Sequence, residues 1–273
     1  MDSENKYCYR YPHPAVTVDC VIFGFDGRGL KIILIERGLP PYEGYWALPG
    51  GFVKPDETLE EGAARELFEE TGLANVYMEQ FKAFSRPDRD PRERVITIGF
   101  IGLVKPDDYK LLAGDDAAKA FWFDEDTLPP LAFDHREIIR EAREHLKEIQ
   151  RLKPVAFQLL SKTFSISELQ KIYEVINRAS YDRRNFLRTA VESDTVLEVG
   201  SQPEDSSSSE TCCCCCEPAP AFRPAPKRQK LYTANPAIFE DGDGESDSGS
   251  RASSDVQPKN APTKGLFDFL FRK

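Results

Sequence analysis

Apolar and polar residues alternate along several stretches of the chain with the period of two that is typical of β-strands. Residues 15–25 alternate through Val16, Val18, Cys20 and Ile22, which predicts a half-buried strand. Residues 95–104 are almost continuously apolar, and this pattern predicts a strand at the centre of a sheet. The complete set of predicted strands in this part of the chain is 15–25, 31–36, 76–84, 95–104 and 120–123.

Two stretches instead have the period of an α-helix. Thr58 and Glu61 have the spacing of a capping box that begins the first helix, and Gly72 is placed to end it. Residues 134–151 put their apolar side chains on about one face, which predicts an amphipathic helix. Strands and helices therefore mix within residues 1–150, and we predict one α/β domain there.

A different pattern begins after residue 150. Ser165 and Glu168 form a second capping-box spacing, and a turn at 178–181 separates the helix that it opens from another predicted helix. That second helix carries Arg183, Arg184 and Arg188, and a strand-like stretch follows at 195–199. Two helices joined by a short turn, with a wing strand behind them, are the layout of a winged helix-turn-helix. We predict such a domain over residues 151–235.

Low-complexity sequence interrupts the predicted wing. Residues 201–220 contain runs of Ser and Cys, and the basic stretch 223–232 then resembles the returning wing strand. The five consecutive Cys lack the paired spacing of a tetrahedral zinc site. Residues 236–273 are acidic and rich in Ser and Gly, which predicts a disordered tail. Its apolar end at 265–272 fits either a peptide that docks on a partner or a segment that folds back.

Charge is unevenly distributed along the 273 residues. Residues 1–150 hold 19 Lys and Arg against 29 Asp and Glu, and the remainder holds 17 of each. The acidic first half is therefore not expected to bind nucleic acid unaided. Residues 151–200 carry 8 basic and 6 acidic side chains, so that region presents either a phosphate-binding patch or a solvated surface. No apolar run reaches 18 residues and the N-terminus lacks a secretory pattern, which predicts a cytoplasmic protein without a membrane span.

Candidate chemistry is concentrated on the first helix. Glu66, Glu69 and Glu70 are spaced at i, i+3 and i+4, so their carboxylates share one face. Such a face is either solvated or gathers a hard divalent cation, which offsets the repulsion between like charges. Gly50 and Gly51 precede this helix in a turn whose backbone can approach a metal or a phosphate closely.

A loop between two predicted strands, residues 85–94, is rich in Arg and Pro. It forms either a charged hairpin tip or a clamp in which Arg86, Arg89 and Arg92 hold diphosphate oxygens. His135 lies at the start of the predicted helix 134–151, where a structural cap or a surface contact is favoured over a catalytic role because no nucleophile is nearby. Arg65 is placed to reach back to Glu57 and hold the loop against the helix.

The run G-x5-E-x7-R-E-L-F-E-E-T-G-L, from Gly51 to Leu73, resembles the Nudix box at every defining position. The resemblance implies an α/β/α sandwich with a mixed sheet that cleaves a nucleoside diphosphate linked to another group, using Mg²⁺ or Mn²⁺. It implies that Glu66, Glu69 and Glu70 hold the metal, and that Glu57 and Arg65 support them. The proton acceptor stays open between Glu66 and an acid beyond the box, for which Asp115, Asp116 and Glu125 are candidates.

Two further likenesses narrow the expected function. The stretch R-P-D-R-D-P-R, with F-W-F-D and L-P-P-L-A-F-D-H downstream, is similar to ADP-ribose pyrophosphatases and related regulators. Residues E-L-Q-x-x-Y-E and R-R-N-F resemble the winged-helix module behind Nudix domains in transcriptional regulators of NAD metabolism. The leading hypothesis is hydrolysis of ADP-ribose or a similar nucleoside diphosphate derivative to AMP and a sugar phosphate. The alternative is an ADP-ribose-sensing regulator that binds duplex DNA; both relatives imply a homodimer.

Overall fold

The computed structural model describes residues 10–105, 119–203 and 228–239. Contacts within the chain divide it into two compact units. The first consists of Met1–Leu159 and Lys171–Ala179, and the second of Leu160–Gln170 and Ser180–Lys273. The predicted domain boundaries at 150 and 235 stay predictions.

The first unit contains a seven-stranded mixed sheet and two long helices, as predicted for an α/β domain. In chain order its elements are β1 (Ala15–Phe25), β2 (Leu30–Glu36), β3 (Trp46–Ala47), β4 (Gly50–Phe52), α1 (Leu59–Thr71), β5 (Met78–Phe84), β6 (Val95–Val104), β7 (Ala120–Asp124), the 3-10 turn η2 (Glu125–Thr127), α2 (His135–Leu152) and the 3-10 turn η3 (Val155–Leu159). The short strands β3 and β4 had no sequence signal, because two or three residues are too few to show a period.

Strand β1 is the centre of the sheet. It pairs antiparallel with β2 through the predicted hairpin and parallel with β6 in a register from Ala15 opposite Val95 to Gly24 opposite Val104. β5 adds to the far side of β6, whereas β7 pairs with β2 and β4 pairs with β1. The prediction that residues 95–104 form a central strand is confirmed.

The prediction that residues 15–25 form a half-buried strand is wrong. Every residue of β1 from Thr17 to Phe25 is buried, including Asp19. Successive side chains of a strand point to opposite faces, so both faces of β1 must be covered. The alternation that predicted one exposed face came from polar Thr17 and Asp19, which are buried inside the domain.

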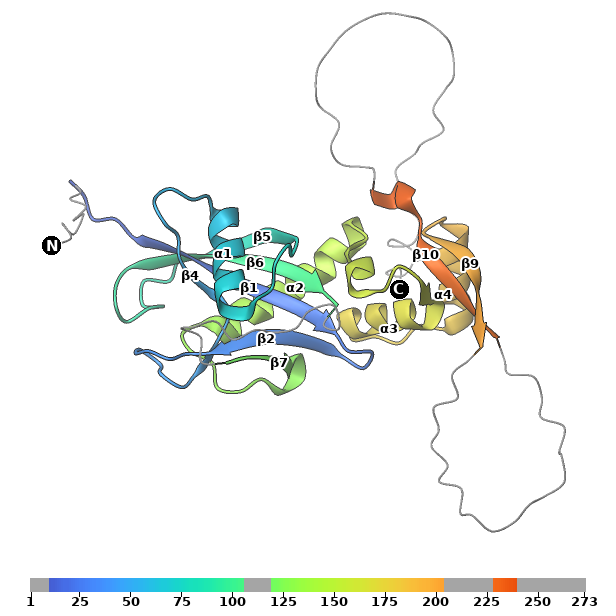
Figure 1. The fold of residues 1–273 in the computed structure, drawn as a ribbon, viewed down its shortest axis with the longest axis horizontal. Coiled ribbons are helices and arrows are strands. Elements are labelled where there is room, and N and C mark those ends of the chain that lie inside the picture. The colour runs from blue at the N-terminus through green and yellow to red at the C-terminus, as the bar shows by residue number, and fades with distance from the viewer. Residues whose placement is uncertain (1–9, 106–118, 204–227, 240–273) are drawn as a thin grey trace, which may run out of the picture. The chain divides into compact units, whose positions relative to one another are not determined.

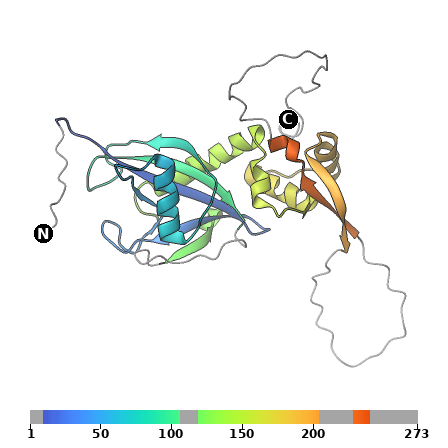
Figure 2. The ribbon, with the colours of Figure 1, turned by 45° about the horizontal axis from the view of Figure 1, so that its top comes forward.

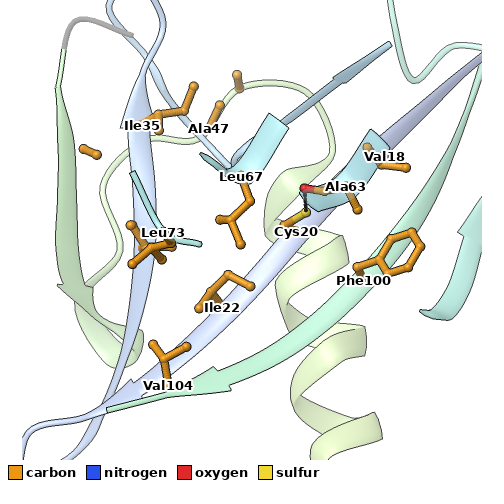
Figure 3. Packing of buried hydrophobic residues seen from close by; sticks show 13 residues of the cluster. Val18, Cys20, Ile22, Ile35, Ala47, Ala63, Leu67, Leu73, Phe100 and Val104 are labelled. Carbon is orange, nitrogen blue, oxygen red and sulfur yellow. Dashed lines mark hydrogen bonds between the residues drawn. The ribbon is translucent and has the colours of Figure 1, made fainter. Parts of the chain in front are cut away.

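The two helices cover opposite faces of the sheet, which makes the predicted α/β/α sandwich (Figures 1 and 2). Helix α1 contributes Ala63 and Leu67 to a core with residues from β1, β2 and β6. Figure 3 shows this core, in which the Cys20 thiol donates to the carbonyl oxygen of Ala63. Helix α2 buries the apolar face that its pattern predicts, including Ile138, Ala142 and Leu146.

The second unit has a three-stranded sheet in the order β8, β10, β9. Its elements are β8 (Phe164–Ser165), α3 (Ile166–Asn177), α4 (Arg183–Glu192), β9 (Val196–Pro203), β10 (Arg228–Ala234) and the 3-10 turn η4 (Pro236–Phe239), with the second half of α3 assigned to the first unit. β10 pairs antiparallel with β9 although residues 204–227 separate them, as the predicted displacement of the wing strand requires. Apart from η4, the predicted tail lies outside the described residues.

In the described ranges, no helix combines the length and the apolar character that crossing a membrane requires. Helix α2 is the longest of the described helices, but its exposed face is charged, so it is not apolar enough to cross a membrane. The five-Cys run and the apolar C-terminal segment both fall outside the described residues.

Candidate active site

Helix α1 begins and ends where its sequence predicts. The side chain of Thr58 accepts from the backbone N–H of Glu61, and the Glu61 carboxylate accepts from the N–H of Thr58. Gly72 ends the helix with φ of 76°, a left-handed conformation that glycine adopts at little cost. Buried Ala63 and Leu67 fix the rotation of the helix against the sheet, and this rotation turns its acidic face toward the turn at Gly50 and Gly51.

Arg65 organises the carboxylates around it. Its guanidinium donates to both oxygens of Glu57, at 2.9 and 2.5 Å, and to the carbonyl oxygen of Phe52 at 3.1 Å. A second edge of the same group donates to Glu66 at 2.8 Å and to Glu69 at 3.1 Å. This network holds the loop before α1 against the helix, and the guanidinium lowers the pKa of Glu57 to about 2. Glu57 and Arg65 thus make the contact that the sequence predicts.

Glu70 is in a different environment from its neighbours. Its carboxylate accepts a 2.9 Å hydrogen bond from the backbone N–H of Gly50 and forms no ion pair with any described side chain. Burial raises the pKa of Glu70 to about 8, against the effect of that hydrogen bond, and the charges of Glu66 and Asp19 add to the increase. A partly buried, unpaired carboxylate of this kind is often part of a functional site.

The two glycines of the turn are required by steric contact. A Cβ atom on Gly51 would lie 2.5 Å from a carboxylate oxygen of Glu66, and one on Gly50 would lie 2.1 Å from the carbonyl oxygen of Val18. Real Cβ atoms do not approach other atoms so closely. The Gly-Gly turn therefore lets the backbone of β4 lie directly against Glu66 and Glu70, which brings together four of the residues that the sequence singled out.

These residues fit a divalent cation by their chemistry. Within the ranges that the structure describes, no three His, Cys, Asp or Glu side chains are already arranged to hold an ion. Glu66 and Glu69 are engaged by Arg65, and Glu69 is half-exposed. Glu70, however, is a partly buried oxygen donor beside a second carboxylate, and carboxylate oxygens are the ligands that Mg²⁺ prefers. A cation here would offset the charge repulsion that raises the pKa of Glu70.

A cavity of about 190 Å³, which we call the cleft, lies on the other side of the Gly-Gly turn. Its walls include Gly50, Gly51 and Phe52 from β4, with Arg37, Arg92 and Phe133. The guanidinium groups of Arg37 and Arg92 both lie over the ring of Phe133, at 4.8 and 5.7 Å from its centroid. Two cations and an aromatic ring thus face a cavity beside the acidic helix. The glutamates of α1 do not line the cleft. Gly50 and Gly51 do line it, and they also lie against Glu66 and Glu70.

The predicted arginine clamp is divided among three environments. Arg92 lines the cleft with its side chain 41% exposed, and it pairs with Asp90 at 2.7 Å. Arg89 also lines the cleft, but its side chain is only 4% exposed and donates to Asp134 at 2.8 Å and to Asp19 at 3.3 Å. Arg86 is exposed, pairs with Asp88 and lines a different cavity. The structure therefore does not bring the three arginines together.

Arg89 belongs to a buried polar network beneath the cleft. Besides Arg89, the network contains Asp19, Asp134 and His135, all of them buried. His135 Nδ1 accepts a 2.8 Å hydrogen bond from the N–H of Leu48, and burial lowers the pKa of the imidazole. A neutral ring is the form that can accept this bond. The geometry gives His135 a structural contact, which the sequence interpretation favoured over a catalytic role, although the side chain is buried rather than at the surface.

The sequence alone did not identify Arg37, Phe133 or Asp19. Arg37 follows β2 directly and lies in none of the motifs. Phe133 lies in the stretch L-P-P-L-A-F-D-H, for which the sequence alone predicted no site role. Asp19 had one usable signal, since a carboxylate within an otherwise apolar strand must have a buried partner. Of the candidate proton acceptors, Glu125 is partly buried, lies 3.1 Å from Arg143 and does not line the cleft. Asp115 and Asp116 lie outside the described residues.

Helix α4 presents the arginines predicted to bind DNA. Asp182 caps it by accepting from the N–H of Asn185, and buried Phe186 fixes its inner face. Arg183, Arg184 and Arg188 are all exposed on the outer side. Lys230 of the neighbouring sheet pairs with Glu198, so part of the positive charge on the wing is neutralised.

Two family models match the chain. The NUDIX domain model matches residues 13–142, and the NrtR DNA-binding winged helix domain model matches residues 156–209. Both matches coincide with the regions in which the sequence predicts these modules. The observed order, a mixed sheet with helices followed by a small winged-helix sheet, agrees with them.

Individual relatives represent both modules. The ADPR responsive transcriptional repressor NtrR of Acinetobacter baylyi is 34% identical over 191 residues, 69% of this chain and 76% of that protein. The ADP-ribose pyrophosphatase of Methanocaldococcus jannaschii is 49% identical over 131 residues, 48% of this chain and 74% of that protein.

Solved structures of NrtR from Shewanella oneidensis match most of the chain. The protein alone matches with a TM-score of 0.65 and 26% identity, covering 83% of this chain and 96% of that one. The same protein with a 27mer DNA matches with a TM-score of 0.61 and 27% identity, covering 82% and 94%. The chain belongs to the Nudix family, and its Nudix domain is followed by a winged-helix domain of the NrtR type.

Proposed function

We propose that this chain is a metal-dependent pyrophosphohydrolase that cleaves the diphosphate of ADP-ribose, or of a similar nucleoside diphosphate derivative, to AMP and a sugar phosphate. The observation that carries the proposal is the acidic face of α1, organised by Arg65 and seated against the Gly-Gly turn. The 49% identity to an ADP-ribose pyrophosphatase over the Nudix region supports it.

Glu66, Glu69 and Glu70 are the residues that would hold Mg²⁺ or Mn²⁺. When bound, the cation supplies charge to the diphosphate oxygens and lowers the pKa of the attacking water. Arg65 positions Glu66 and Glu69, while the N–H of Gly50 fixes the orientation of Glu70. Preorganised carboxylates of this kind lower the entropic cost of assembling the reacting groups.

Arg92 and Arg37 are the cations that we assign to the substrate in the cleft. Arg92 is part-exposed and can exchange its contact with Asp90 for a diphosphate oxygen, and a guanidinium matches that geometry well. Arg89 is committed to Asp19 and Asp134, so its role is to hold the floor of the cleft. Phe133 offers a ring face beside both cations.

A direct test incubates the full chain with ADP-ribose and Mg²⁺ or Mn²⁺ and measures released AMP by chromatography. A nucleoside triphosphate and a dinucleotide are run alongside at the same concentration. We expect AMP from ADP-ribose only when the divalent cation is present, with slower turnover of the other compounds. An absence of AMP under all metal conditions would reject the hydrolase.

We propose a second function, binding of duplex DNA by a homodimer in a manner that ADP-ribose alters. The exposed arginines of α4 and the 34% identity to an ADPR responsive repressor favour it. A gel shift at a stated salt concentration, with and without ADP-ribose, tests it, and sedimentation tests the dimer. Binding that ADP-ribose leaves unchanged would reject the regulatory part. The likeness to a DNA-binding repressor also leads us to propose a cytoplasmic location.

A further inference from the structure

A second cavity, of about 830 Å³, lies along the charged side of α2 and shares no lining residue with the cleft. We call it the α2 cavity. All of its lining residues belong to the first compact unit. Its size is within the range of roughly 300–1,000 Å³ that small-molecule sites occupy. Six basic side chains line it: Arg86, Arg136, Arg140, Arg143, Lys147 and Arg178.

Arg143 is the buried member of this set, with its side chain 6% exposed. Its Nη2 donates to the carbonyl oxygen of Val175 at 2.6 Å, and its Nε lies 3.1 Å from a carboxylate oxygen of Glu125. Its Nη1 is buried and has no hydrogen-bond partner among the residues that the structure describes. A buried charged donor without a partner is unfavourable, and a bound acceptor would offset that cost.

The carboxylates that line the α2 cavity do not satisfy its cations. Four acidic residues line it against six basic ones. Asp134 is committed to Arg89, which lies outside this cavity, and Glu144 pairs with Lys147 at 2.7 Å. Glu125 is close to both Arg143 and Arg178, at 3.1 and 3.7 Å. Carboxylates outside the lining set pair with three of the cations: Asp88 with Arg86, Glu141 with Arg140 and Asp126 with Arg178. These pairs are solvent-exposed and therefore weak, so a more highly charged ligand can replace them.

We propose that the α2 cavity is a second ligand site, which binds a small molecule carrying a phosphate monoester. Such a group carries about two negative charges at neutral pH and three acceptor oxygens. Its oxygens match the exposed guanidinium groups of Arg140 and Arg178, whose pairs with Glu141 and Asp126 it can replace, and its charge complements the incompletely paired Arg143. Leu128 and Ile139 supply apolar wall for the remainder of the ligand.

Ribose 5-phosphate is the probe, titrated calorimetrically into the full chain at fixed ionic strength, with unphosphorylated ribose as comparator. The test variant combines Arg140→Ala with Arg178→Gly. Both side chains are well exposed, at 68% and 60%, and Arg178 has φ of 50°, which glycine accepts. Arg143→Lys is a second variant that keeps a charge at the buried position but loses the planar donor fork.

Arg151→Ala is the matched control, since Arg151 is an exposed residue in the last turn of α2 that does not line the cavity. Arg92→Ala controls for binding in the cleft. We expect the double variant and Arg143→Lys to weaken ribose 5-phosphate binding by about tenfold or more, as loss of charge-assisted hydrogen bonds predicts. Arg151→Ala should bind as the wild type does, Arg92→Ala should keep the component of binding that the double variant loses, and ribose should not bind.

Three outcomes would overturn the proposal. If the wild-type protein does not bind ribose 5-phosphate, the proposed site does not exist. Binding that is lost in Arg92→Ala but kept in the double variant places the probe in the cleft. Binding that falls equally in Arg151→Ala, or that ribose shares, shows that the phosphate is not recognised by the cavity.

Discussion

The helices α1 and α4 are both capped and charged, but they use charge in opposite ways. In α1 every candidate functional side chain is held by a neighbour, from Arg65 between Glu57, Glu66 and Glu69 to Glu70 on the N–H of Gly50. In α4 the candidate arginines are exposed. Within the described part of the chain, only Arg188 of the three has a side-chain hydrogen bond or ion pair, a 3.5 Å hydrogen bond to Asn185.

The charged side chains of α1 are held in fixed positions, whereas those of α4 are free to attract a charged partner. Preorganised groups contribute to chemistry because their geometry is fixed before the substrate arrives. Exposed, loosely held arginines contribute mainly through long-range charge, which acts on any phosphate backbone and is weakened by salt. Changes in α1 should therefore alter a positioned set of charges and affect hydrolysis, whereas changes in α4 should act through long-range charge and affect DNA binding.

The largest expected effect is that of Glu70→Gln. The amide removes the partly buried negative charge while keeping nearly the same shape, so turnover of ADP-ribose should fall by about 10³-fold. AMP release measures the rate, and circular dichroism checks that the fold is kept.

Glu60→Gln is the matched control, since Glu60 is exposed in the first turn of the same helix. Its turnover should equal that of the wild type. If Glu70→Gln also hydrolysed ADP-ribose at the wild-type rate, Glu70 would have no part in catalysis.

The next effect concerns α4. Replacing Arg183, Arg184 and Arg188 together by Ala should weaken duplex DNA binding by roughly 100-fold, at about 1 kcal/mol for each contact. The dependence of the logarithm of affinity on the logarithm of salt should become less steep by about three. Fluorescence anisotropy over a salt series measures both quantities.

Hydrolysis by the triple variant should not change. A triple variant that binds DNA with the wild-type salt dependence would exclude α4 as the phosphate-contacting helix. Equal loss of hydrolysis would contradict the division of roles between α1 and α4.

Gly51→Ala should have an intermediate effect. The added Cβ would meet the Glu66 carboxylate at 2.5 Å and displace it, without removing any charge. We expect turnover to fall by about tenfold, since small displacements of positioned groups are costly. Gly29→Ala is the control because a Cβ there meets no atom within 4 Å. Unchanged turnover in Gly51→Ala would show that the position of Glu66 does not matter.

The smallest effect is a dependence of stability on pH through Glu57. The hydrogen bonds from Arg65 lower the pKa of Glu57 from 4.5 to about 2. Its stabilising contribution is therefore complete above about pH 4.5 and is lost as pH falls toward 2. The difference in Tm between wild type and Glu57→Gln should be largest near pH 6 and shrink below pH 4. A constant difference over that range would contradict the ion pair.

The sequence predicted α1 well because its information is local. The capping box, the ending glycine and the spacing of Glu66, Glu69 and Glu70 all lie within one continuous segment. The same holds for the hairpin of β1 and β2 and for the capping box at Ser165 and Glu168.

The cleft was predicted poorly because its parts are distant in sequence. Arg89 looked like an exposed loop residue, and only the fold reveals that Asp19 and Asp134 bury it. Periodicity shows which face of a strand is apolar, but it does not show that a second helix covers the other face. Arg37 and Phe133 meet only because the end of β2 lies near the start of α2.

The parallel pairing of β1 with β6 has a consequence for synthesis of the chain. β1 is complete at Phe25, yet its partner ends only at Val104. A nascent chain leaving the ribosome must therefore carry an unpaired, apolar strand edge until most of the Nudix domain has been translated. This interval is when the polypeptide is most exposed to aggregation, and chaperones that shield strand edges would act on it then.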